Sequence, residues 1–234
     1  MPLIEAVTCS VADALGAENC GANRIELCVA IEVGGLTPST GLAREVVARC
    51  GLPVVAMVRP RSGGFEYSLE ELTVMERDAE IMLEIGIQGV VFGILDADCR
   101  IDVAACRRIL DRAGRLQGVF HRAFDSTPDP AEAIEQSIDL GFRRILTSGH
   151  AQTALAGADG LKRLRDLAKG RIEILAAGGI RADNVRAVID GSGVDQIHLG
   201  PMQRVGEQAG LYGDGYLMLD EPALRAVVAE FKAR

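Results

Sequence analysis

Short runs of hydrophobic residues alternate along this chain with segments of helical pattern. The runs are rich in β-branched residues and nearly continuous, which is typical of parallel strands covered on both sides. They lie at Leu3–Cys9, Arg24–Cys28, Val54–Arg59, Gly89–Leu95, Gln117–His121, Arg144–Thr147, Ile172–Ala176 and Asp195–Leu199. Strands that alternate with helices predict a parallel sheet with right-handed crossovers.

Glycine punctuates this repeat, since one follows each helical segment and precedes the next strand. A glycine at this position relieves the strain of a left-handed helix cap. The glycines concerned are Gly21, Gly51, Gly86, Gly114, Gly141, Gly170 and Gly193.

Helix starts are marked as well. Ser68 with Glu71 has the spacing of a capping box, and so has Asp129 with Glu132, where Pro130 takes the first helical position. Eight strand–helix units within residues 1–234 predict an α/β fold, a single-domain (β/α)8 TIM barrel. An open doubly wound sheet is the alternative, but the first strand is not followed by the GxGxxG signature of that class.

Composition agrees with a globular protein: 48% of the residues are hydrophobic and 25% are charged. No apolar stretch approaches the ~18 residues of a membrane span, and the N-terminus lacks the pattern of a secretory signal. The six cysteines are scattered, with no CxxC pair. We therefore expect reduced thiols, a cytoplasmic location and no membrane partner.

The formal net charge of −8 argues against nucleic acid as a main partner, since phosphate backbones bind basic surfaces. It leaves room for a local cationic pocket and hence for a small-molecule anion.

Active sites of such barrels lie at the C-terminal ends of the strands. Alternation along the strands places Glu5 and Cys9 on one face of the first strand, and it turns Glu26 and Cys28 toward the barrel interior. A buried carboxylate requires a partner, and Arg59 is the expected one. An ion pair that merely fills the barrel is the structural alternative to a functional site.

Several strand ends carry groups suited to an anion. Arginine forks match carboxylate and phosphate, and glycine turns let backbone amides approach a ligand. The candidate anion-binding residues are Arg59, Arg61, Ser148, Gly149, Gly178 and Gly179.

His121 follows the fifth strand, with Asp125 nearby, and a histidine at this place is a candidate acid, base or metal ligand. Glu5, Glu26, His121 and Asp125 are the candidate catalytic residues, and we expect Glu5, Glu26, Arg59 and His121 to form one polar network. This set predicts proton transfer on a small phosphorylated or carboxylated substrate.

Soft ligands offer a different interpretation. Cys9, Cys28, Met57 and His121 lie at predicted strand ends and are groups that Cu(I) prefers. Buried cysteine also occurs as a small hydrophobic residue without metal. The HExxH, GxSxG and P-loop motifs are absent from the sequence.

Several of these strings together resemble the CutC family, whose members are labelled copper homeostasis proteins. The matching segments are Arg24–Cys28, Gly34–Ser39, Met57–Arg61 with Gly63–Phe65, Phe120–Asp125, Arg144–Gly149 and Gly178–Ile180.

The resemblance implies a (β/α)8 barrel, a cytoplasmic location, a homo-oligomer and an association with copper. Some family members carry a cysteine two residues after the first-strand glutamate, and it is considered a copper ligand together with the cysteine of the second strand. Here the first of these positions is Val7, the second is Cys28, and Cys9 lies two residues beyond Val7 on the same face.

Overall fold

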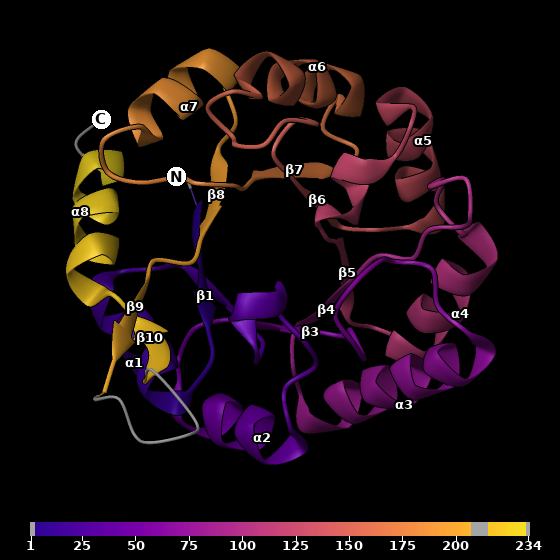
Figure 1. Ribbon diagram of the computed structural model, residues 1–234, viewed down its shortest axis with the longest axis horizontal. Helices are drawn as coiled ribbons and strands as arrows, with labels where there is room; N and C mark the ends of the chain where they lie inside the picture. The colour runs from indigo at the N-terminus through magenta and orange to yellow at the C-terminus, as the bar shows by residue number, and fades with distance from the viewer. Residues whose placement is uncertain (1–2, 207–214, 233–234) are drawn as a thin grey trace.

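The computed structural model describes residues 3–206 and 215–232, and it forms a closed barrel of parallel strands inside a ring of helices (Figure 1). The barrel strands are β1 (Leu3–Thr8), β2 (Arg24–Leu27), β3 (Val54–Met57), β4 (Gly89–Phe92), β5 (Gln117–Phe120), β6 (Arg144–Thr147), β7 (Glu173–Ala176) and β8 (Gln196–Leu199). They pair in sequence order, and β1 closes the ring against β8. The predicted α/β barrel is confirmed, and the open-sheet alternative is excluded.

The helices cover the outside of the barrel. They are α1 (Val11–Cys20), α2 (Thr40–Arg49), α3 (Leu69–Ile85), α4 (Val103–Ala113), α5 (Pro130–Leu140), α6 (Ala158–Ala168), α7 (Val185–Ser192) and α8 (Glu221–Lys232). None of the helices in the described part of the chain is long and apolar enough to cross a membrane.

Side chains alternate along each strand between this helical layer and the barrel interior. In β2, Ile25 and Leu27 join the large core beneath the helices, whereas Cys28 belongs to a small interior cluster. The other buried members of that cluster are Val7, Val55, Met57, Val91 and Val119. The faces predicted for β2 are therefore confirmed.

Most strands end earlier than the hydrophobic runs suggest. The run Val54–Arg59 contains a strand that stops at Met57, and the run Gly89–Leu95 contains one that stops at Phe92. Val58, next after β3, is nevertheless fully buried. The runs are longer than the strands because the loops that leave the barrel are covered too.

The sequence signals predicted most of the helix ends correctly. The capping box of Ser68 and Glu71 is present. Asp129 caps α5, but Glu132 binds Arg100 instead of returning to the cap. The glycines predicted at the ends of α2 and α6 are displaced, because Cys50 and Lys169 take the two cap positions themselves.

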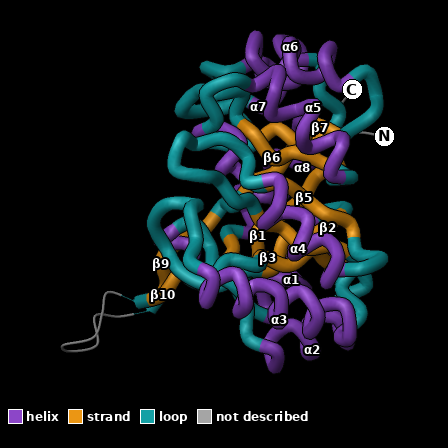
Figure 2. The backbone as a smooth tube through the Cα atoms, turned by 90° about the vertical axis from the view of Figure 1, so that its right-hand side faces the viewer, coloured by secondary structure: helices purple, strands orange, loops and turns teal. Residues whose placement is uncertain are grey.

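Two insertions shape the C-terminal end of the barrel. The short helix η1 (Ile31–Val33) follows β2, and Ile31 packs against the interior cluster. After β8, the strands β9 (Met202–Val205) and β10 (Tyr216–Leu219) form an antiparallel pair that projects to one side of the barrel (Figure 2). Met202 also packs against the interior cluster, so both insertions cover the barrel mouth.

Candidate functional site

Two thiols meet where the first two strands end. Cys9 follows β1 and Cys28 follows β2, and the register that pairs Thr8 with Leu27 sets the cysteines side by side. Their sulfur atoms are 3.9 Å apart. Cys28 is fully buried and Cys9 is partly exposed, so the pair connects the barrel interior to its mouth.

A thioether lies beside this thiol pair. A Cβ atom placed on Gly35 would be 3.3 Å from the Cys28 sulfur and 3.5 Å from the Met57 methyl group. Gly35 has φ of 85°, a conformation that favours glycine. The loop after β2 therefore approaches Cys28 and Met57 as closely as a residue without a side chain allows.

The two thiols differ in acidity because they share a hydrogen bond. The hydrogen bond from Cys28 lowers the pKa of Cys9, although burial opposes this effect. The same hydrogen bond, together with burial, raises the pKa of Cys28. Cys9 is thus the thiol that ionises first, with the Cys28 S–H donating to it.

A second polar group lies on β1, β2 and β8. Glu5 is fully buried, and its carboxylate accepts hydrogen bonds from Arg24 and, at 2.8 Å, from Nδ1 of His198. Burial alone would raise the pKa of Glu5, but His198 and Arg24 together lower it to about 2. Glu5 is therefore ionised and forms a buried ion pair with Arg24.

Glu26 lies next to this group and has an unusual environment. Its side chain is buried, and no described residue bonds to its Oε2 atom. Burial raises the pKa of Glu26 to about 7, while the neighbouring Glu5 adds to the shift and His198 and Arg24 oppose it. A buried carboxyl oxygen without a partner is costly, which supports Glu26 as a candidate functional residue.

The expected Arg59–Glu26 pair does not form, and the expected network of Glu5, Glu26, Arg59 and His121 is wrong. Arg59 lies beyond the end of β3, and its guanidinium donates to the carbonyl groups of Val33, Gly35 and Gly63. Arg59 thus ties the loops after β2 and β3 together. The cation within reach of the buried carboxylates is Arg24, which faces inward two residues before Glu26.

Arg61 is engaged as well. Its Nε atom binds Glu71 at 2.5 Å, and its other nitrogens donate to carbonyl groups of its own loop. Arg59 and Arg61, which follow β3, therefore hold the backbone of the neighbouring loops in place, and Arg61 also binds α3 through Glu71.

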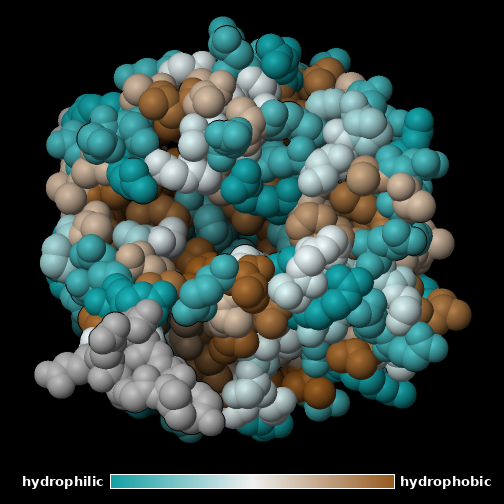
Figure 3. Space-filling model, viewed as in Figure 1, coloured by the Kyte–Doolittle hydropathy of each residue, from teal (hydrophilic) through white to brown (hydrophobic). Residues whose placement is uncertain are grey.

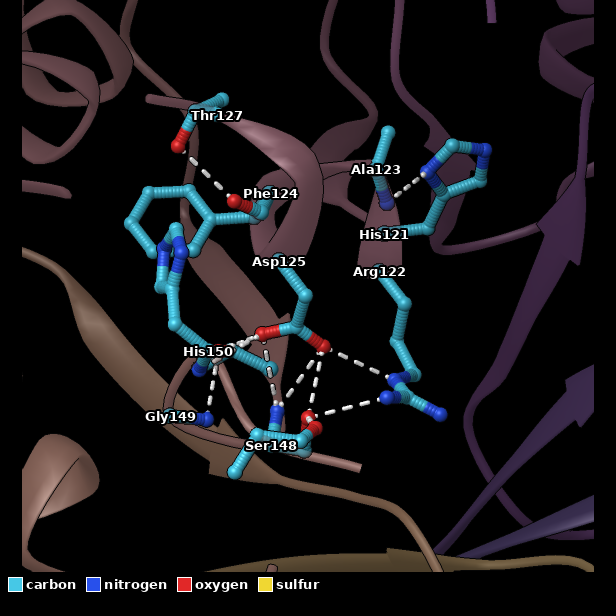
Figure 4. Close-up of polar contacts among 11 residues, drawn as sticks. His121, Arg122, Ala123, Phe124, Asp125, Thr127, Ser148, Gly149 and His150 are labelled. Carbon is cyan, nitrogen blue, oxygen red and sulfur yellow. Dashed lines mark hydrogen bonds and ion pairs between the residues drawn. The ribbon is translucent and has the colours of Figure 1, made fainter. Parts of the chain in front are cut away.

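His121 follows β5 and points away from the polar contacts around Asp125 (Figure 4). Its Nδ1 accepts a hydrogen bond from the backbone of Ala123 at 3.2 Å, its ring lies against Phe65, and its Nε2 has no partner in the described chain. Burial, reinforced by the charge of Arg59, lowers the pKa of His121 to about 3. The imidazole is therefore neutral at physiological pH.

Asp125 is saturated with hydrogen bonds. It accepts from the hydroxyl group of Thr147, from the amide and hydroxyl groups of Ser148, from the amide of His150 and from Arg122 (Figure 4). These contacts join the segment after β5 to the loop after β6. A carboxylate with this many donors anchors a loop.

The glycine turns after β6 and β7 have different roles. The amides of Ser148 and Gly149 are taken by Asp125 and by the hydroxyl group of Thr147. Gly178 and Gly179 both have positive φ, 106° and 67°, and no described residue accepts a hydrogen bond from either amide. Consecutive free amides of this kind form an anion-binding concavity.

A cavity of about 660 Å³ lies above this turn. Its lining includes Gly178, Gly179, Arg122, His198, Val7 and Met202. Figure 3 shows this face of the molecule hollowed near its centre. Of the predicted anion-binding residues, only Gly178 and Gly179 line the cavity.

The prediction from sequence missed Arg24, Arg122 and His198. Arg24 and His198 each alternate along their strand with residues that face the helices, so the period of two was an available signal for both. Arg122 lies in η2 (Arg122–Ser126), where no strand periodicity applies.

The closed parallel barrel and its ring of helices define the protein as a (β/α)8 barrel, with polar groups at the carboxyl ends of its strands. The chain belongs to the CutC family, whose model matches residues 3–202.

Relatives from distant organisms support this assignment. A family protein CutC of Treponema denticola is 46% identical over 201 residues, covering 86% of this chain and 82% of that protein. The human copper homeostasis protein cutC homolog is 42% identical, covering 84% of this chain and 72% of the human protein.

The comparison with solved structures supports both the family assignment and the barrel fold. The putative copper homeostasis protein CutC of Streptococcus agalactiae superposes with a TM-score of 0.81 at 35% identity, covering 86% of this chain and 98% of that one. Phosphoribosyl anthranilate isomerase of Thermotoga maritima superposes with a TM-score of 0.62 at 13% identity, covering 100% of both chains. The second similarity shows the fold alone.

Proposed function

We propose that this protein binds Cu(I) through Cys9 and Cys28 at the mouth of the barrel. The observation that carries the proposal is the 3.9 Å separation of the two sulfur atoms. Two metal–thiolate bonds of about 2.3 Å, the zinc value, span up to about 4.6 Å, so one ion fits between these sulfurs without movement of either strand.

The surroundings suit a soft, monovalent cation. Thiolate and thioether are the ligands that Cu(I) prefers, and the Met57 thioether lies next to Cys28. The carboxylates of Asp13, Glu32 and Glu26 contribute negative charge at the thiol pair. Copper homeostasis is also the role named for the human relative and for the streptococcal structure.

An anaerobic Cu(I) titration against a chromophoric Cu(I) chelator tests the proposal. We expect one tight equivalent in the wild type, because two thiolates hold the ion, and loss of this site in Cys28→Ser and in Cys9→Ser.

Cys99→Ser is the matched control, since it removes an exposed thiol far along the chain from the pair. It should keep the full equivalent. Retention of the tight site in Cys28→Ser would show that the protein binds copper at a different position.

A second candidate function rests on the cavity. We propose that it takes a small phosphorylated or carboxylated molecule, held by the free amides of Gly178 and Gly179 and by Arg122. The carboxyl ends of β7 and β8 are where many barrels bind phosphate. Glu26, which lies beside the cavity-lining His198, is the candidate proton-transfer group for a reaction there.

A thermal-shift screen with inorganic phosphate, sugar phosphates and organic acids tests this site. A ligand that binds only the folded state stabilises it, by about 2.7 kcal/mol at a hundredfold excess over its dissociation constant. Arg122→Gln should reduce the shift, whereas Arg61→Gln, outside the cavity, should leave it unchanged. The anion site is refuted if no anion stabilises the wild type.

We further propose a cytoplasmic location and a homo-oligomeric state. The cysteines are all free, which suits a reducing compartment. The β9–β10 pair projects from the barrel and exposes Tyr216, which offers a surface for a second copy (Figure 2). Light scattering coupled to size-exclusion chromatography measures the mass in solution, and a mass of 24.9 kDa would exclude the oligomer.

A further inference from the structure

The polar group on β1, β2 and β8 contains metal-ligating side chains and lies apart from the thiol pair. Ligand atoms of Glu5, Glu26 and His198 lie within 4.8 Å of one another. We propose that this group holds a divalent cation of the hard or borderline class, with Glu26 and His198 as its ligands. The proposal does not depend on Cu(I) binding by the cysteines.

Glu5 orients His198 rather than binding the cation itself. Its two oxygen atoms are occupied by Arg24 and by the Nδ1 of His198. A carboxylate that accepts from one imidazole nitrogen fixes the ring and leaves the other nitrogen for a metal, an arrangement common around metal ligands. The hydrogen bond to Glu5 engages Nδ1 and leaves Nε2 as the other ring nitrogen, and His198 is one of the residues that line the cavity.

Glu26 supplies the independent observation. Only 3% of the residue is exposed, and its Oε2 has no partner in the described chain. The fold thus keeps a carboxylate oxygen buried beside an oriented imidazole, although a hydrophobic residue would pack there at lower cost. A cation between Glu26 and His198 explains why the carboxylate is there.

The charges agree with a divalent ion. Arg24 already forms an ion pair with Glu5, whereas the Oε2 atom of Glu26 has no hydrogen-bond partner among the described residues. Two protein ligands leave open coordination positions, and one of these ligands, His198, also lines the 660 Å³ cavity together with Gly178, Gly179 and Arg122. An anionic oxygen of a cavity ligand would complete the coordination and balance the remaining charge.

Mn²⁺ is the probe that separates this site from the thiol pair, because it prefers oxygen and imidazole ligands to thiolate. The experiment follows the loss of the free Mn²⁺ signal in electron paramagnetic resonance as protein is added. We expect one saturable equivalent in the wild type and at least about tenfold weaker binding in Glu26→Gln and in His198→Gln.

Two controls make the test specific. Asp183→Asn removes a carboxylate from the lining of the same cavity, and Cys28→Ser removes the thiol beside Glu26; both should bind Mn²⁺ as the wild type does. Glu26→Gln keeps the shape of the side chain and changes a carboxyl group whose Oε2 has no partner among the described residues, so it should fold even if His198→Gln does not. Absence of saturable Mn²⁺ binding, or equal affinity in Glu26→Gln, would overturn the proposal. The Cu(I) titration can succeed or fail independently of either result.

Discussion

At the scale of single residues, burial in the barrel interior shifts the pKa of an ionisable group away from its charged form unless a partner stabilises the charge. Burial raises the pKa of the Glu26 carboxyl to about 7 and lowers that of the His121 imidazole to about 3. Glu5 behaves differently, because Arg24 and His198 stabilise its charge and hold its pKa at about 2. The barrel interior therefore contains both an ionised carboxylate, Glu5, and a neutral imidazole, His121, and their partners account for the difference.

His121 provides the pH prediction. The unfolded imidazole binds a proton near pH 6.5 and the folded one near pH 3, so falling pH favours the unfolded state within that window. His121→Asn keeps an acceptor for the Ala123 amide but cannot titrate. Between pH 7 and pH 5, the wild type should lose about 2 kcal/mol more unfolding free energy than the variant.

Urea denaturation of both proteins at the two pH values gives the difference directly. Because the remaining groups titrate in both proteins, their contributions cancel. Equal losses would mean that His121 accepts a proton in the folded state as readily as in the unfolded one.

At the scale of elements, the loop between β6 and α6 shows how close backbone contact specifies glycine. A Cβ atom on Gly149 would lie 2.4 Å from the carbonyl oxygen of Gly157 and 2.8 Å from the amide of Leu161. Gly149 was predicted as an anion ligand, but these contacts give it a structural reason to be glycine. By contrast, Gly86, which ends α3 with φ of 90°, has open space around it.

Alanine substitutions at Gly86 and Gly149 distinguish the cost of a left-handed backbone conformation from the cost of a steric clash. Gly86→Ala should lower the unfolding free energy by about 1–2 kcal/mol, the cost of a left-handed residue. Gly149→Ala adds a backbone clash and should cost at least about 3 kcal/mol. Chemical denaturation measures both, and similar costs would show that the loop moves aside to admit a side chain.

At the scale of the whole molecule, closure removes every sheet edge from the barrel. Each of β1 to β8 has two neighbours, and the N-terminal strand is held by β2 on one side and β8 on the other. The β9–β10 pair, in contrast, consists of two strands outside the barrel. A strand with two partners opens only when the barrel itself opens.

Hydrogen exchange followed by mass spectrometry tests this closure. Amides of β1 and β8 should exchange as slowly as those of the central strands β4 and β5, and those of β9 and β10 should exchange much faster. If β1 or β8 exchanged as fast as β9, the barrel would be open between its ends in solution.

The sequence by itself determined the barrel and the inward face of β2, because continuous hydrophobic runs and a period of two depend on local chain geometry. It also identified Cys9 and Cys28 as candidate ligands, since both follow predicted strands. It misjudged strand ends such as Met57, because buried loops are as hydrophobic as strands.

Only the tertiary structure decided which polar groups meet. Arg59 was expected to pair with Glu26 because a buried carboxylate requires a partner, yet carbonyl groups of the loops after β2 and β3 bind the guanidinium instead. His198 reaches Glu5 across a separation of 193 residues, through closure of β8 against β1. A pattern along the chain predicts which face a side chain takes, but the partner depends on register and loop path, which form only when the barrel closes.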